Sequence, residues 1–94
     1  MSNEAPNDAF WERADAVINL ANQQTESAQS EDVSGSLLYA SARFNAFLIA
    51  AQASDVDALR MGKEDAVAYF TEQYRQLLLD NLDDYIENFD EYSA

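Results

Sequence analysis

The chain has 94 residues, of which 48% are hydrophobic and 12% aromatic. This length fits one domain with enough apolar material for one compact core, so we do not expect disorder throughout. Eighteen acidic against five basic residues give a formal net charge of -13, which repels nucleic acid and anionic membranes. We therefore expect neither nucleic acid nor a membrane among the partners.

The composition also limits the chemistry that the chain can perform. It has no cysteine and no histidine, so no disulfide supports the fold, and the usual nucleophile and general base are missing. The carboxylates fall mainly on the outward faces of the expected helices, where they keep ordinary acidity. The sequence also has no glycine-rich phosphate loop. We therefore expect a protein that is not an enzyme and uses no cofactor.

The N-terminal segment MSNEAPND carries two acids and no Lys or Arg, and no apolar run follows it. This pattern does not predict a secretory signal peptide, and we expect a cytoplasmic location. We expect residues 1–94 to form a single helical domain. Within it, residues 1–7 are expected to be a flexible N-terminus.

Two glycines and one proline in the whole chain predict long helices. Apolar residues recur at helical spacing over about 8–28, with polar residues opposite them. The polar segment QSEDVSGS then predicts a turn, with Ser34 or Ser36 as N-cap of a second helix over about 33–53. That helix is apolar nearly all round, but its polar residues are too frequent for a membrane span. We expect it to be the central helix of a bundle.

Arg43 is the only charged residue of the second expected helix. Inside an apolar helix, its guanidinium must reach solvent or meet a carboxylate. We predict a buried ion pair between Arg43 and either Asp15 or Glu72, in preference to a ligand-binding role. The aromatic residues around it are predicted to form core rather than a ligand pocket. These are Phe10, Trp11, Tyr39, Phe44, Phe47 and Phe70.

The third expected helix covers about 55–91 and has the strongest periodic signal in the sequence. Ser54, within a capping box, or Asp55 is expected to cap its start. Its apolar face extends over almost ten turns, and only Gly62 interrupts it, as a kink or short break. The fold class predicted is all-α, a three-helix antiparallel bundle. Its long C-terminal helix is either continuous or kinked near Gly62.

This third helix is longer than its expected neighbours, at about 1.5 Å per residue. Its last turns carry apolar residues that the other two helices cannot all cover, namely Leu82, Tyr85, Ile86 and Phe89. A second copy of the chain can cover them, which predicts a homodimer through this surface or through the outer side of the second helix. The alternative is that the third helix kinks and folds over.

Six acids without any basic residue occupy the C-terminal run DNLDDYIENFDEY. Calcium prefers such oxygen ligands, but its loop needs alternating acids and a glycine at the sixth position. In a calcium loop that began at Asp80, Leu82 would stand at the third position, which needs an oxygen ligand, and Tyr85 at the sixth, which needs glycine. We therefore expect a solvated helix face here and no metal site.

The segments FWERADAVINLAN, SLLYASARFNAFLIAAQA and YFTEQYRQLLLDNLDDYIENFDEY resemble a small bacterial family, domain of unknown function 3144. The resemblance covers nearly the whole chain. Its members are short, acidic and helical, and the family has no assigned activity. The resemblance thus implies a fold and a bacterial origin, and it carries over no catalytic residue.

Three classes of function remain open from the sequence. The first is a non-catalytic interaction or structural module that acts as a homo-oligomer or binds an unknown protein partner. The second is an acidic protein that imitates nucleic acid and inhibits a basic protein. The third, ranked last, is a small-ligand carrier or enzyme with a pocket between helices. Salt dependence separates the first two, because only the second should lose its partner steeply as salt rises.

Overall fold

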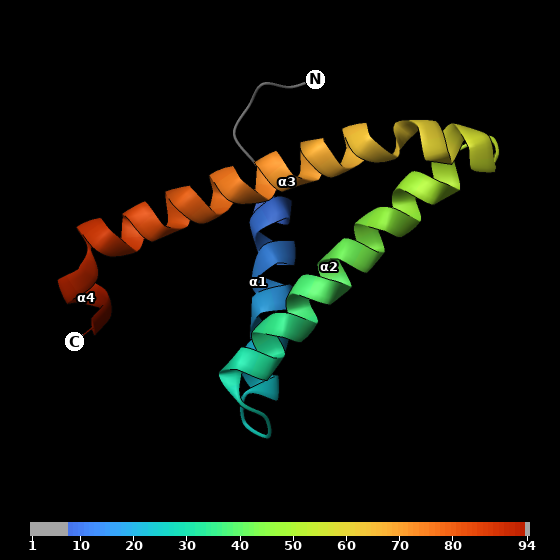
Figure 1. Cartoon of the computed structure of the whole chain (residues 1–94). Coiled ribbons are helices and arrows are strands. Elements are labelled where there is room, and N and C mark those ends of the chain that lie inside the picture. Colours follow the sequence, from blue (N-terminus) through green and yellow to red (C-terminus); the bar gives the residue numbers. More distant parts are fainter. Residues whose placement is uncertain (1–7, 94) are drawn as a thin grey trace. The chain divides into compact units, whose positions relative to one another are not determined.

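The computed structural model describes residues 8–93, and these residues are helical almost throughout, with no strand among them. The helices are α1 (Asp8–Gln24), α2 (Ser30–Gln52), α3 (Val56–Glu87) and α4 (Phe89–Ser93) (Figure 1). The prediction of an all-α chain with a long C-terminal helix is confirmed. Residues 1–7, predicted to be flexible, lie outside the described residues.

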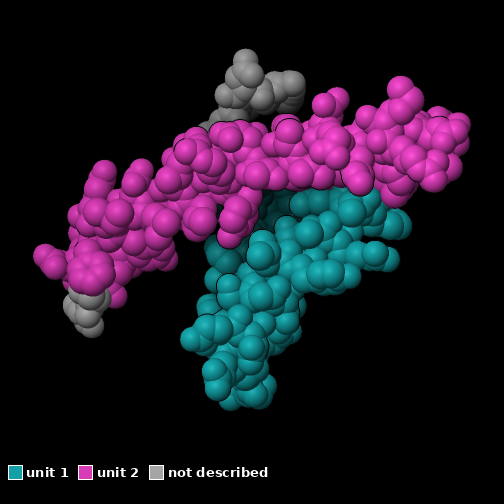
Figure 2. Space-filling model, in the orientation of Figure 1, with its two compact units in different colours: residues 1–47 teal, residues 48–94 magenta. Residues whose placement is uncertain are grey.

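The chain divides into two compact units, residues 1–47 and residues 48–94 (Figure 2). The first unit holds α1 and most of α2, and the second holds the last turn of α2 with α3 and α4. The division falls inside the helix that the sequence analysis placed at the centre of a single domain.

The turn between α1 and α2 differs from the predicted one at both ends. The Thr25 backbone N–H donates to the carbonyls of Ala21 and Asn22, both at 3.2 Å, and its hydroxyl donates to the Asn22 carbonyl at 2.6 Å. These bonds use the last carbonyls of α1, so the helix ends at Gln24, four residues before the predicted end.

The second helix begins earlier than predicted, at Ser30. The Gln29 carbonyl accepts from the backbone N–H of Asp32 and of Val33, at 3.0 and 3.1 Å. Acids in the first turn, Glu31 and Asp32, favour a helix start here because they complement the partial positive charge of the N-terminus. Ser34 and Ser36 therefore lie inside α2, and their prediction as N-caps is wrong.

The third helix begins where the sequence predicted, and Asp55 is its cap. Asp55 has extended backbone (φ -160°), and its carboxylate accepts from the Ala58 N–H at 2.8 Å. The helix then continues through Gly62 without a break for 32 residues, which corresponds to about 48 Å at 1.5 Å per residue. A short break at Gly62 is thus excluded.

The predicted helix over 55–91 is in fact two helices, because α3 ends at Glu87 and Asn88 separates it from α4. The Asn88 side-chain amide donates to the Asp84 carbonyl at 3.1 Å and to the Asp84 carboxylate at 2.9 Å. Asn88 leaves the helical conformation (φ -114°, ψ 29°), and its bonds to Asp84 cap the last turn of α3. Periodicity alone cannot locate such a stop.

Very little of the apolar material is buried within the chain. Val33, 6% exposed, is the only buried residue among those whose burial is described. The aromatic residues predicted to form the core are instead exposed, from 37% at Phe70 to 67% at Tyr39. That prediction is wrong for the single chain.

Candidate interaction surface

One face of α3 is a continuous line of exposed apolar side chains, which we call the α3 stripe. Apart from the adjacent pair Leu77 and Leu78, its members follow one another at spacings of three and four residues, the repeat that keeps side chains on one helix face. They are 37–59% exposed. The members are Val67, Phe70, Tyr74, Leu77, Leu78, Leu82 and Tyr85.

The four residues predicted as an interaction surface lie at the C-terminal end of this line. Leu82 is 49% exposed, Tyr85 50%, Ile86 70% and Phe89 63%. Leu82 and Tyr85 belong to the α3 stripe, Ile86 stands at its edge, and Phe89 opens α4. All four side chains are thus exposed and apolar, over the end of α3 and the start of α4, and their role in association stays a prediction.

The opposite face of α3 is polar and negatively charged. Glu72, Gln76, Asp80, Asp83 and Glu87 follow at spacings of three and four residues. Gln76 donates to the Asp80 carboxylate at 2.9 Å, and the Glu72 carboxylate lies 3.8 Å from the Arg75 guanidinium. Such exposed pairs contribute little to stability. The helix therefore presents one apolar and one solvated face.

The apolar face of α3 contains two polar residues, Lys63 and Asn81. Lys63 lies four residues before Val67, and Asn81 lies four residues before Tyr85, so both fall on the line of the α3 stripe. The Asn81 amide donates to the carbonyl of Leu77 at 2.8 Å, in its own helix. Lys63 is exposed and forms no ion pair among residues 8–93.

The turn between α3 and α4 is held by Asp84. Its carboxylate accepts from Asn88 through one oxygen and from the Tyr92 hydroxyl through the other, both at 2.9 Å. The rings of Tyr92 and Tyr85 lie 4.4 Å apart. The hydrogen bond to Asp84 and the negative charge of that carboxylate raise the pKa of Tyr92 above its ordinary 10.0.

Arg43 does not occupy the predicted environment. It is exposed on α2, and no ion pair to it occurs among residues 8–93. Asp15 therefore does not pair with Arg43 in the described chain, and a pair with Glu72 of the second unit stays a prediction. Because Arg43 is exposed on α2, its guanidinium stays hydrated and needs no carboxylate partner to offset desolvation.

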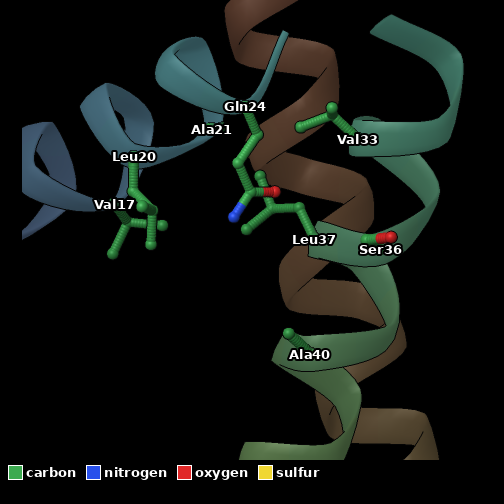
Figure 3. Close-up of a pocket in the computed structure, with 8 residues that line it drawn as sticks. All are labelled: Val17, Leu20, Ala21, Gln24, Val33, Ser36, Leu37 and Ala40. Atoms are coloured by element: carbon green, nitrogen blue, oxygen red, sulfur yellow. The ribbon is translucent and has the colours of Figure 1, made fainter. Parts of the chain in front are cut away.

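A small hollow lies between α1 and α2 within the first unit (Figure 3). Its volume is about 180 Å³, below the roughly 300 Å³ at which small-molecule pockets begin. Its lining is mostly apolar, with Gln24 and Ser36 as the polar members. The lining residues are Val17, Leu20, Ala21, Gln24, Val33, Ser36, Leu37 and Ala40.

Two further observations concern metals and membranes. Among residues 8–93, no three acidic side chains come close enough together to hold a metal ion. Within the same residues, no helix combines the length and apolar character needed to cross a bilayer.

Fold and surface together define a small, acidic all-α protein with an exposed apolar helix face. Over residues 10–86 the chain matches the family described as Protein of unknown function (DUF3144), and it belongs to that family. Its structure is similar to the NMR structure of the protein NB7890A from Shewanella sp., with a TM-score of 0.78. The two sequences are 37% identical, and the similarity covers 99% of this chain and 97% of that chain. Among curated proteins, none matches significantly.

Proposed function

We propose that this protein is a non-catalytic module of the bacterial cytoplasm that forms a homodimer through the apolar face of α3. The observation that carries the proposal is the α3 stripe with its C-terminal patch, in which Ile86 is 70% and Phe89 63% exposed. The similarity to a Shewanella protein supports the bacterial origin.

The amount of exposed apolar surface supports association. Burying apolar area contributes about 25 cal/mol per Å², and a stable interface typically buries roughly 800 Å² on each partner. A helix of about 48 Å with apolar residues along its whole face offers a surface on that scale. Since Val33 is the only described residue that is buried, stability and association are expected to be linked.

The chemistry of the surface supports a binding role rather than catalysis. Its side chains are aliphatic and aromatic, and the nearby acids are exposed on α3, where they keep contact with water. Neither nucleic acid nor a membrane is part of the proposal, because the charge of -13 repels both. A further protein partner would bind the same apolar face.

The test is the solution mass of the wild type at several concentrations and two salt levels, by analytical ultracentrifugation. We expect a dimer that persists at high salt. The double variant Tyr85→Glu with Phe89→Glu should be a folded monomer, because it places charges in the apolar patch.

A matched double variant controls for the added charge. Met61→Glu with Leu79→Glu adds the same two charges at exposed positions of α3 away from the α3 stripe, and it should remain dimeric. A wild type that stays monomeric at high concentration would refute the homodimer. If both double variants dissociated equally, the contact between copies would not lie at Tyr85 and Phe89.

A further inference from the structure

The two halves of α3 differ in charge. From Val56 to Arg75 there are four acids and three bases, whereas from Gln76 to Ser93 there are six acids and no base. The bases are Arg60, Lys63 and Arg75. Two copies of α3 therefore interact very differently when they lie parallel and when they lie antiparallel.

A parallel pair would place the two six-acid ends side by side. Like charges that close together repel, and a narrow gap between helices reduces the screening by water. An antiparallel pair instead places each acidic end beside the half that carries Arg60 and Lys63. The charge distribution thus disfavours one orientation and favours the other.

Lys63 makes this preference specific, because it is a cation on the line of the α3 stripe itself. At the other end of the same line lie Asn81, Asp84 and Asn88, whose oxygens are acceptors. The amides of Asn81 and Asn88 already donate within the chain, and the oxygen of a side-chain amide can still accept a hydrogen bond. In a parallel pair Lys63 would face the other Lys63, and in an antiparallel pair it faces these acceptors.

We propose that α3 pairs antiparallel with α3 of a second copy, across a two-fold axis near the middle of the helix, between Phe70 and Tyr74. The Lys63 ammonium of each copy then donates to the cluster of Asn81, Asp84 and Asn88 on the other. This inference rests on the proposed homodimer and adds its orientation and its polar contact.

The orientation can be measured with spin labels, since the chain has no cysteine of its own. Two single-cysteine variants are needed, Gln73→Cys near the proposed axis and Glu87→Cys at the end of α3. Both positions are exposed and lie off the α3 stripe. Distances between labels on the two copies are read by double electron–electron resonance.

Antiparallel pairing predicts a short distance for Gln73→Cys and a long one for Glu87→Cys. Fourteen residues on either side of the axis correspond to about 40 Å between the two labels at Glu87, at 1.5 Å per residue. Parallel pairing would give distances under about 25 Å for both, given helix axes roughly 8–10 Å apart.

The remaining outcomes are distinct from one another. Short distances at both positions would overturn the antiparallel orientation and leave the homodimer intact. Long distances at both would show that the copies meet through another surface, which also overturns it. The absence of any distance between copies would refute the homodimer and, with it, the proposed function.

A charge reversal tests the polar contact separately. Lys63→Glu should weaken the dimer at least tenfold, because the new carboxylate would face Asp84 of the second copy. Arg13→Glu on α1 makes the same change in net charge and should have a much smaller effect. Equal weakening by both variants would show that net charge matters and Lys63 does not.

Discussion

Asp84 connects α3 to α4 through two side chains at once, Asn88 and Tyr92. The Tyr92 hydroxyl donates to the Asp84 carboxylate at 2.9 Å, and the Tyr92 ring lies beside that of Tyr85. Because the bond favours the neutral phenol, the pKa of Tyr92 is raised above 10.0. A raised pKa stabilises the folded turn below pH 10, and this contribution is lost as the pH rises through the pKa of Tyr92.

The first prediction at this scale concerns that titration. Asp84→Asn removes the negative charge beside the phenol and should lower the pKa of Tyr92 toward 10.0. Tyrosinate absorbance, followed as a function of pH and compared with Tyr92→Phe to assign the step, measures the change. Asp83→Asn removes a neighbouring charge that makes no hydrogen bond to Tyr92, so it serves as the control. Identical curves for the two variants would contradict the assignment of Asp84 as the partner.

Helical periodicity located the helices, whereas their ends depend on individual side chains. The Asp55 cap follows from residue type and was predictable, because an acid before an apolar helical pattern is a strong start signal. The stop at Asn88 and the early start at Ser30 involve short-range hydrogen bonds that many sequences could form. The apolar repeat continues past Asn88 to Phe89, so it gives no sign of the break.

The second prediction, at the scale of the element, concerns the continuity of α3. A Cβ atom built at Gly62 meets nothing within 4 Å, and the same holds at Gly35 in α2. Gly62→Ala should therefore stabilise the helix by about 1 kcal/mol, since glycine loses more backbone entropy on folding. Chemical unfolding at a fixed protein concentration measures the gain, with Gly35→Ala as the matched control.

Destabilisation by Gly62→Ala alone would contradict a freely exposed Gly62. It would indicate that a second copy or another protein approaches the backbone there. Because Gly62 lies off the α3 stripe, the proposed dimer leaves the position open.

At the scale of the whole molecule, the sequence predicted the surplus of apolar surface but not its extent. Comparing helix lengths identified Leu82, Tyr85, Ile86 and Phe89 as exposed, and they are. A different argument, the helical spacing of aromatic residues, placed Phe44 and Phe47 in a core, although they are 62% and 64% exposed. Periodicity shows that a face is apolar, and it does not show whether the same chain or a second one covers that face.

The last prediction concerns how salt acts on the whole acidic molecule. Each copy carries a charge of -13, so two copies repel one another, while their apolar contact does not weaken with salt. Raising the salt shortens the screening length from about 10 Å at roughly 0.1 M to about 3 Å at 1 M. This suppresses the repulsion more than it weakens the few contacts of Lys63, so the dimer should bind more tightly. Its dissociation constant, measured by sedimentation over a potassium chloride series, should fall severalfold.

Magnesium chloride at equal ionic strength serves as the control and should give the same dissociation constants if screening is the cause. A larger effect of magnesium would instead indicate cation binding to the acidic face. A dissociation constant that rises with salt would contradict an apolar interface and show that charge attraction holds the copies together.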